Sequence, residues 1–336
     1  MSSSEKKTQR RLIFIAGWGR SGSTILASVL GSIDRAASLG EVRYLWDRGL
    51  IENRLCGCGS AVRDCGFWSR VVDRAGIVAD GPAAAHMATR IGKAAVWRQL
   101  GALLTGRIGA YRAAREGELR TLRRVYRAAF DEAGVDTLID ASKTPPYAIN
   151  LLEEAGFTVY ILHLVRDPRA VAFSWARWKD TEESQGTAWF PRYSALRSAL
   201  YWVLFNWLAL RFESIPGSRY LRVRYKDFCA EPRRVTADIL RFCNIPAENA
   251  HWTGANRVAL QPQHSISGNP TRFRTGTVSI ERDDEWLTAM PWLSRLVVTA
   301  VCAPLMRRFG YALLQAEDRP AAAASRLERL KDNARR

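Results

Sequence analysis

Short runs of apolar, often β-branched residues alternate along the chain with stretches of helical periodicity. Four runs have the length and hydrophobicity of buried parallel strands: 12–16, 137–139, 158–165 and 220–223. Helical patterns lie at 24–32, 147–155, 170–178 and 236–243. Strands that alternate with helices predict an α/β fold, with a doubly wound sheet of about four to five mostly parallel strands flanked by helices.

The remaining segments suggest one domain with an insertion. Residues 82–132 have no strand pattern, so we expect a helical insertion between the first and second strands of the sheet. The polar, basic residues 1–11 predict a disordered tail. Residues 315–336, with an Ala run and mixed charges, predict a C-terminal tail or helix. A single domain is therefore expected over 12–314.

Composition and charge exclude some classes of protein and favour an anionic partner. The 336 residues are 47% hydrophobic, which excludes a disordered chain and a disulfide-dense scaffold. Lys and Arg number 50 against 33 Asp and Glu, a net charge of +17. Residues 81–130 hold ten of these basic residues and only two acidic ones, so this stretch alone carries +8.

The apolar runs are too short to predict a secretory signal or a membrane span. The most apolar stretch, 199–210, contains Asn206 and lies between Arg197 and Arg211. A membrane span needs ~20 apolar residues, so this stretch is better interpreted as a buried helix. Six cysteines fit thiols in a reducing compartment, and we expect a cytoplasmic protein.

A glycine-rich loop follows the first predicted strand and precedes a helix. From Gly17 through Gly22 to Thr24 its spacing matches the nucleotide-binding P-loop, which predicts a P-loop-like sheet. Such a loop aims backbone N–H groups and a helix dipole at phosphate. Ser23 stands where a kinase carries its phosphate-binding lysine, and Arg20 supplies a cation elsewhere. The alternative is a tight turn with a solvated arginine.

A second candidate anion site follows the strand 158–165. Arg166 stands at its carboxyl end, where ligands bind in open α/β sheets, and Ser174 lies in the next helix. Alone, the sequence Arg-Asp-Pro-Arg is also an ordinary turn and helix start. Two anion sites suggest a nucleotide that is phosphorylated in two places.

Three cysteines within ten residues form the pattern C-x-C-x6-C at Cys56, Cys58 and Cys65. The first interpretation is a locally packed thiol loop, the second a disulfide and the third a zinc site. The spacing is not a standard zinc pattern, and the nearest candidates for a fourth ligand are Asp64 and His86.

Taken together, these motifs resemble the sulfotransferases that use 3′-phosphoadenosine 5′-phosphosulfate (PAPS), in particular the bacterial and tyrosylprotein-like branch. The glycine-rich loop resembles the family's 5′-phosphosulfate loop in its arginine version, at Gly19, Arg20, Ser21, Gly22, Ser23 and Thr24. Arg166 and Ser174 resemble its 3′-phosphate site. The resemblance covers roughly 12–272 and includes no motif of the insertion.

Three further segments carry the resemblance. Glu41 lies where this branch has a catalytic glutamate, and Lys143 where it has a catalytic lysine. Residues 264–272 resemble the late loop that closes over the cofactor, which implicates Gly268, Asn269 and Arg272. Without the resemblance, Glu41 could be a first-turn residue of a helix over 42–47 and Lys143 a solvated loop residue. Related bacterial proteins often carry a similar cysteine-rich stretch, which favours a structural role for it.

The resemblance implies in-line transfer of a sulfuryl group from PAPS to a hydroxyl. Arg20 and Lys143 would neutralise charge on the leaving nucleotide, and Glu41 would remove the acceptor's proton. His264 is an alternative base. We expect no metal requirement and no metal ligands in the site.

Two other functions compete with this one. A P-loop small-molecule kinase is weakened by Ser23, and a basic nucleic-acid-binding protein leaves both phosphate motifs unexplained. We therefore expect no nucleic-acid partner. The acceptor is a small molecule, a glycan or a lipid, which leaves peripheral contact with a membrane open. The sequence does not indicate an oligomeric state.

Overall fold

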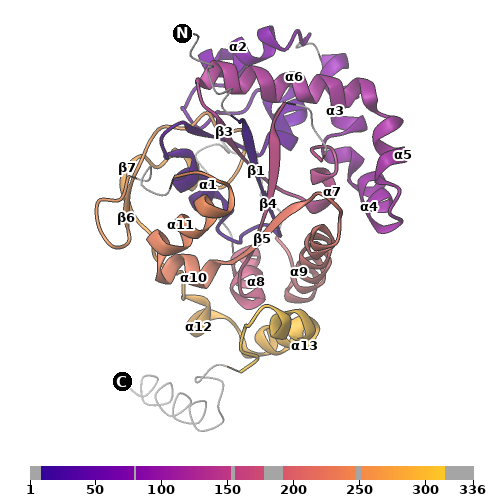
Figure 1. Cartoon of the computed structure of the whole chain (residues 1–336). Coiled ribbons are helices and arrows are strands. Elements are labelled where there is room, and N and C mark those ends of the chain that lie inside the picture. The colour runs from indigo at the N-terminus through magenta and orange to yellow at the C-terminus, as the bar shows by residue number, and fades with distance from the viewer. Residues whose placement is uncertain (1–8, 79–80, 153–155, 178–191, 247–250, 315–336) are drawn as a thin grey trace. The chain divides into compact units, whose positions relative to one another are not determined.

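The fold is described from a computed structural model of the chain (Figure 1). It describes residues 9–78, 81–152, 156–177, 192–246 and 251–314. Most of both predicted tails therefore lies outside the described residues, and the first strand begins at Arg11.

A five-stranded parallel sheet confirms the predicted fold class. The strands are β1 (Arg11–Ala16), β2 (Ala36–Gly40), β3 (Thr137–Lys143), β4 (Thr158–Val165) and β5 (Arg219–Arg224). Their order in the sheet is β2-β3-β1-β4-β5, and every neighbouring pair is parallel. A separate antiparallel pair joins β6 (Arg257–Leu260) to β7 (Gly276–Ser279).

Helices separate the strands along the chain. Those before β4 are α1 (Ser23–Gly31), α2 (Gly66–Arg74), α3 (Gly81–Arg90), α4 (Val96–Leu104), α5 (Ile108–Ala113), α6 (Glu116–Ala133) and α7 (Pro145–Ala148). Those after it are α8 (Pro168–Ala176), α9 (Ala195–Leu210), α10 (Tyr225–Ala230), α11 (Pro232–Phe242), α12 (Trp286–Ala289) and α13 (Trp292–Arg308).

The described chain divides into two compact units. The first takes in the described residues within 1–165 and 205–282, and it contains the whole parallel sheet. The second takes in those within 166–178, 191–204 and 283–336, including α8, α12 and α13. We describe each unit by itself.

Helices cover both faces of the sheet in the first unit (Figure 1). Ile13 and Ile15 of β1 point into a core with α1, α10 and α11. Phe14, between them, points to the other face, where its ring lies 6.2 Å from that of Tyr147 in α7. This alternation buries β1 on both sides, as its near-continuous apolar sequence predicts.

The residues predicted as a helical insertion are helical, but two strands precede them rather than the one that was predicted. Residues 81–133, all of them described, contain α3 to α6 and no strand. They follow β2, a strand that the sequence pattern did not predict. That strand is Ala-Ala-Ser-Leu-Gly, whose small residues carry little strand propensity.

Other predicted elements differ mainly in length. The helix predicted over 147–155 ends at Ala148 as α7, and turns follow it up to Leu152; its last three predicted residues lie outside the described ranges. The strand predicted over 137–139 continues to Lys143. The stretch 199–210 is helical as predicted, but Leu200 and Trp207 are exposed rather than buried. Among the described residues, none of the helices is long and apolar enough to span a membrane.

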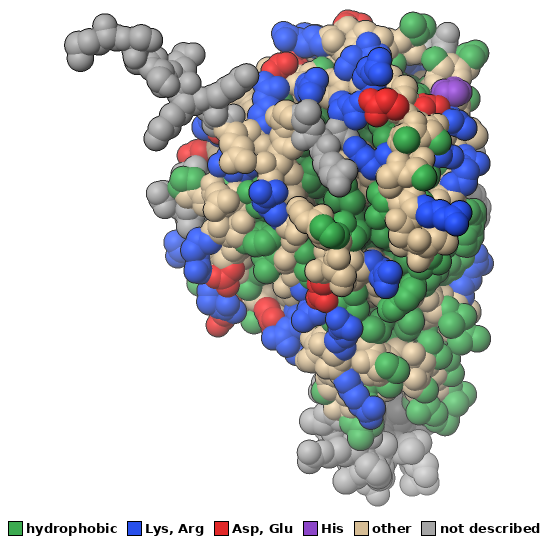
Figure 2. Space-filling model, turned by 45° about the vertical axis from the view of Figure 1, so that its right-hand side comes forward, with side chains coloured by type: hydrophobic (Ala, Val, Ile, Leu, Met, Phe, Trp, Pro, Cys, Tyr) green, Lys and Arg blue, Asp and Glu red, His purple; other side chains and the backbone are tan. Residues whose placement is uncertain are grey.

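Ion pairs within the protein use part of the insertion's positive charge. Arg90 pairs with Glu118 at 2.8 Å, and Arg123 pairs with Glu116. Figure 2 shows Lys and Arg side chains scattered over the face in view rather than gathered in one stripe. These surface ion pairs neutralise some of the basic side chains locally but add little stability.

Candidate active site

The glycine-rich loop links β1 to α1 in a conformation that needs two of its glycines. Gly17 has φ 142°, and a Cβ there would lie 2.6 Å from the Leu164 carbonyl oxygen. Gly22 has φ 88°, and its Cβ would lie 2.2 Å from the Tyr225 ring. Only glycine meets both conditions. As the N-cap of α1, Gly22 leaves the first amides of that helix without a capping side chain of its own.

The polar side chains of the loop are largely enclosed. Ser21 and Ser23 are buried, and the Ser21 hydroxyl donates to the Trp18 carbonyl oxygen at 2.7 Å. Arg20 has a left-handed backbone with φ 66°. Burial lowers the pKa of its guanidinium below the ordinary value, and attraction to Glu41 partly offsets that shift. A cation and a helix N-terminus therefore lie on the same short loop.

Glu41 and Lys143 meet at the carboxyl ends of neighbouring strands. Glu41 follows β2 and Lys143 ends β3; the Lys143 ammonium donates to Glu41 Oε1 at 2.5 Å. Their side chains are 10% and 17% exposed, so solvent screens this pair weakly. The structure thus brings together two residues that lie 102 positions apart in the sequence.

An irregularity in β3 turns Lys143 toward this position. Phe14 pairs with Asp140 but Ala16 pairs with Lys143, so β3 contains one residue more than β1 between these two pairs. Lys143 has φ 63°, and its carbonyl oxygen accepts from the Gly17 N–H at 2.8 Å. The same residue therefore holds the start of the glycine-rich loop and the ammonium beside Glu41.

Asp140 holds this turn in place through hydrogen bonds to Ser142. Its carboxylate accepts from the Ser142 hydroxyl at 2.5 Å, from the Ser142 N–H at 2.8 Å and from the Tyr126 hydroxyl at 2.6 Å. Complete burial raises its pKa to about 6, although these hydrogen bonds act in the opposite direction. Ser142 in turn accepts from the Arg43 N–H at 3.0 Å, which links β3 to the turn after Glu41.

The late loop packs directly on Glu41. The Glu41 N–H donates to the Ile266 carbonyl oxygen at 2.7 Å, and the Ile266 N–H donates to Leu39 at 2.8 Å. Gly268 is close enough that a Cβ there would lie 3.5 Å from Glu41 Oε1 and 3.8 Å from the Thr24 hydroxyl. The Asn269 N–H lies 3.4 Å from that hydroxyl oxygen. The loop predicted to close over the site therefore reaches both α1 and Glu41.

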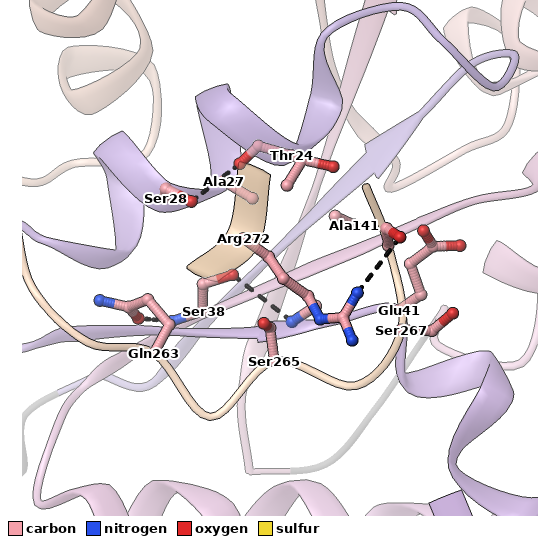
Figure 3. Close-up of a pocket in the computed structure, with 12 residues that line it drawn as sticks. Thr24, Ala27, Ser28, Ser38, Glu41, Ala141, Gln263, Ser265, Ser267 and Arg272 are labelled. Carbon is pink, nitrogen blue, oxygen red and sulfur yellow. Dashed lines mark hydrogen bonds between the residues drawn. The ribbon is translucent and has the colours of Figure 1, made fainter. Parts of the chain in front are cut away.

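A small pocket lies between these segments (Figure 3). Its walls come from α1, the ends of β2 and β3, and the late loop: Thr24, Ala27, Ser28, Ser38, Gly40, Glu41, Ala141, Gln263, Ser265, Ser267, Gly268 and Arg272. Arg272 is buried and donates to the carbonyl oxygens of Gly268 and Leu55 at 3.3 and 3.1 Å. Hydroxyl groups, one carboxylate and one guanidinium belong to the residues that line this pocket.

Arg166 and Ser174 belong to the second unit. Arg166 follows β4 in the chain, is buried, and donates to the Asp283 carbonyl and carboxylate oxygens at 3.2 and 3.3 Å. Ser174 is a buried residue of α8. The other arginine of the motif, Arg169, forms a two-point ion pair with Asp167, the residue that caps α8. Arg169 therefore has a structural use, whereas Arg166 remains a candidate for phosphate.

The three cysteines of the C-x-C-x6-C pattern gather around His264. Cys65 Sγ lies 3.3 Å from His264 Nδ1 and 3.6 Å from Cys58 Sγ. All six cysteines lie within the described residues and are free thiols. Neither fourth ligand considered in the sequence analysis reaches them, since His86 contacts Glu118 and Asp64 is exposed. His264, considered there only as an alternative base, points Nδ1 at the thiols.

A model of the sulfotransferase family matches residues 12–249 of the chain. The chain belongs to the sulfotransferase family. The matched residues contain the glycine-rich loop, Glu41, Lys143 and the Arg166 motif, and they end before the late loop. This confirms the resemblance found in the sequence.

Curated relatives match about half of this chain. Carbohydrate sulfotransferase 3 of Homo sapiens is 32% identical over 177 residues, which are 48% of this chain and 36% of the relative. The Mus musculus protein of the same name is 28% identical over the same shares. The chain thus spans little more than a third of the length of these relatives.

Among solved structures, the sulfotransferase domain from the curacin biosynthetic pathway is similar to this chain. Its TM-score is 0.50 at 16% sequence identity, and the match covers 92% of this chain and 100% of that domain. At this identity the likeness supports the fold alone.

Sequence reasoning missed several residues of the site. Ser38, Ser265 and Ser267 line the pocket, and all three lie in or beside segments that the resemblance had already singled out. Arg43, two residues after Glu41, is buried and donates to the hydroxyl of Thr144, the residue after Lys143. The only indication of Arg43 in the sequence was that it lies two residues after the proposed base, Glu41.

Proposed function

We propose that this protein transfers a sulfuryl group from PAPS to the hydroxyl of an acceptor. The observation that carries the proposal is the buried contact between Lys143 and Glu41, at the carboxyl edge that also carries the glycine-rich loop. Sulfuryl transfer needs a cation for the leaving group and a base for the acceptor. Membership of the sulfotransferase family supports the same reaction.

The glycine-rich loop fits the 5′-phosphosulfate end of the donor. Gly17 and Gly22 let the loop pack closely against the Leu164 carbonyl and the Tyr225 ring, and the first turn of α1 begins there with amides that no side chain caps. Ser23 and Thr24 would add hydroxyl donors, with Arg20 as the charged partner. Ser23 in place of a P-loop lysine argues against a kinase, which would use that lysine on the β/γ-phosphates of ATP.

The second anion motif suits the 3′-phosphate of the donor. Arg166 is buried and keeps a guanidinium nitrogen at 3.3 Å from the Asp283 carboxylate. An arginine held by a carboxylate can exchange that partner for a phosphate without leaving its site. Ser174 would contribute a hydroxyl.

Lys143 and Glu41 divide the chemistry between them. PAPS supplies the activated sulfuryl group. As the S–O bond to the nucleotide lengthens, negative charge grows on the bridging oxygen, which Lys143 and Arg20 would stabilise. When Lys143 turns to that oxygen, Glu41 Oε1 becomes available to accept the proton of the attacking hydroxyl. No step in this scheme uses a metal ion.

The late loop would exclude water from the reaction. Gly268 and Asn269 lie against Thr24 and Glu41, and Arg272 anchors the loop through the Leu55 carbonyl. Excluding water prevents hydrolysis of the donor and strengthens the electrostatic contacts. This assigns a role to the pocket shown in Figure 3.

A glycan hydroxyl is the first acceptor to test. The curated relatives are named carbohydrate sulfotransferases, and a glycan presents many hydroxyls as acceptors. Hydroxyl-bearing small molecules and lipid head groups come next, because the site chemistry requires only a hydroxyl.

The test measures by chromatography how much adenosine 3′,5′-bisphosphate is formed from PAPS. Each acceptor class is supplied in turn, with and without added Mg²⁺. We expect acceptor-dependent product without Mg²⁺. Lys143→Ala should lower the rate by about 10²–10³-fold, whereas Lys93→Ala, at an exposed position of the insertion, should not change it. Turnover of ATP that requires Mg²⁺, with none of PAPS, would refute the proposal.

A further inference from the structure

Three thiols and one imidazole converge outside the pocket described above, in the same compact unit. We call this set the thiol–imidazole cluster: Cys56, Cys58, Cys65 and His264. The four donor atoms all lie within 4.8 Å of one another. The cysteines come from one short segment, and the histidine comes from a segment 199 residues after Cys65.

The distances match the edges of a tetrahedron around zinc. With Zn–S near 2.3 Å and Zn–N near 2.0 Å, tetrahedral angles put two sulfurs about 3.8 Å apart and a sulfur and a nitrogen about 3.5 Å apart. The Cys58 and Cys65 sulfurs are 3.6 Å apart. His264 Nδ1 lies 3.3 Å from the Cys65 sulfur and 4.0 Å from that of Cys56. We propose that the thiol–imidazole cluster holds one structural Zn²⁺ ion.

The protein holds these donors in place through contacts of its own. The Trp68 indole N–H donates to the His264 carbonyl oxygen at 2.8 Å. The Phe67 ring stacks on the imidazole, with centroids 4.7 Å apart and planes 8° from parallel. The Gly57 N–H donates to the Ser265 carbonyl oxygen at 2.9 Å. Two segments that are distant in sequence are thus joined on both sides of the cluster.

The composition of the cluster favours zinc over the two other interpretations. A disulfide would use two of the three thiols and would leave the third thiol and the imidazole without a role. A merely packed thiol loop does not need an imidazole nitrogen directed at two sulfurs. Three thiolates and one imidazole form a complete soft donor set, with no position left for substrate, as in structural zinc sites.

A metal ion in the thiol–imidazole cluster would stabilise the contact between the cysteine segment and the late loop. His264 lies two residues before Ile266, which pairs with Gly40 and Cys56 and accepts from the Glu41 N–H. A metal bound there would fasten the cysteine segment to the start of the late loop. It would hold Gly268 and Asn269 against the site without taking part in the reaction.

The test starts with the full-length protein, purified under reducing conditions without chelator or metal-affinity resin. We expect one equivalent of zinc per chain by mass spectrometry of the metal. Replacing it with Co²⁺ should give the visible bands of tetrahedral, thiolate-bound cobalt. Stripped protein should melt at a lower temperature and recover its original midpoint when Zn²⁺ is added.

Variants separate the ligands from the other thiols. Cys58→Ser and His264→Ala should each weaken zinc binding at least tenfold. Loss of a residue that only supports a metal ligand already weakens binding by roughly that factor, and loss of a ligand should weaken it more. His264→Cys should retain the metal, because it keeps four donors. Cys229→Ser, outside the cluster, should bind zinc like the wild type.

Three results would overturn the proposal. The first is wild-type protein that neither carries zinc nor binds it one to one when titrated. The second is an unchanged zinc affinity, measured by competition with a chelator, in Cys58→Ser and His264→Ala. The third is an intact mass two hydrogens lower under non-reducing conditions, with the bond mapped between two of these cysteines. None of the three depends on sulfuryl transfer.

Discussion

At the scale of single residues, the two cations proposed to act on the leaving group share an unusual backbone. Arg20 and Lys143 have φ 66° and φ 63°, in the left-handed region that favours glycine. Holding a residue other than glycine there costs about 1–3 kcal/mol. Glycine would avoid that cost at either position but would remove the charge. The strain is therefore consistent with a requirement for these side chains.

Glu41→Gln separates a base from a structural residue. Glutamine keeps the shape and most hydrogen bonds but cannot accept the acceptor's proton, so the rate should fall by about 10²–10⁴-fold. Binding of adenosine 3′,5′-bisphosphate should hardly change. Single-turnover kinetics and calorimetry check both expectations, with Glu52→Gln as the exposed control from the same segment. A folded Glu41→Gln protein with near-normal turnover would exclude the base role.

Arg166→Ala tests the assignment of the 3′-phosphate. A charge-assisted hydrogen bond is worth roughly 1.5–3 kcal/mol, so affinity for adenosine 3′,5′-bisphosphate should fall about 10- to 150-fold. Affinity for adenosine 5′-phosphate should change little. Arg177→Ala, which removes an arginine paired with Glu285 just after α8, is the matched control. Equal losses for both nucleotides would show that Arg166 does not contact the 3′-phosphate.

Single residues also show where sequence reasoning ends. Glu41 and Lys143 could be proposed because each lies in a segment that resembles one of the family, and the fold then brings them to 2.5 Å. His264 could not be assigned to the cysteines, because only the fold brings it 199 residues back to Cys65. Asp140 lies three residues before Lys143 in the sequence, yet its buried contact with Tyr126 depends on α6, whose packing the sequence does not reveal.

At the scale of elements, the site depends on three adjacent parallel strands. β2, β3 and β1 end at the same edge of the sheet, and they lead respectively into Glu41, Lys143 and the glycine-rich loop. The strand–helix alternation predicted this sheet, because buried parallel strands have distinctive apolar runs. It missed β2, because a strand of small residues is recognisable only through its pairing with β3.

Gly22→Ala should disrupt the start of α1. The alanine Cβ would lie 2.2 Å from the Tyr225 ring, so the loop or the ring must move. The backbone φ of 88° at this position is also unfavourable for alanine. We expect a loss of about 1–3 kcal/mol in the free energy of unfolding and weaker binding of adenosine 3′,5′-bisphosphate. Denaturant unfolding and calorimetry measure both. Gly101→Ala in α4, where a Cβ meets nothing within 4 Å, should be neutral or slightly stabilising; matching results for the two variants would contradict the steric argument.

Asp140 predicts a pH dependence of stability. Its folded pKa of about 6 lies above the ordinary value of 3.8, so the folded state holds a proton that the unfolded state has released. This contribution is complete below pH 4 and is lost as the pH rises to about 6, and it amounts to roughly 3 kcal/mol. Unfolding titrations between pH 4 and 7 should show that decline in the wild type.

Asp140→Asn should remove the decline, because an amide does not titrate and the Tyr126 hydroxyl can turn to accept from it. Asp238→Asn, on the exposed surface of α11, removes a carboxylate without touching this network and should keep the wild-type profile. If Asp140→Asn keeps the full wild-type slope, another group is responsible for it.

At the scale of the whole molecule, the charge of +17 admits both a nucleotide and a nucleic acid as partner. Several arginines of the insertion pair with its own glutamates, and the basic side chains are dispersed over the face shown in Figure 2. This dispersed charge does not favour a nucleic-acid partner over a nucleotide.

The most direct measurement is calorimetric titration of the purified protein with three ligands: adenosine 3′,5′-bisphosphate, ATP with Mg²⁺, and a DNA duplex. The account predicts one-to-one binding of the bisphosphate, at least about tenfold tighter than ATP, since one charge-assisted contact to the 3′-phosphate is worth that much. It predicts duplex binding that is weak and disappears with added salt. Tighter binding of ATP, or tight duplex binding without bisphosphate binding, would contradict it.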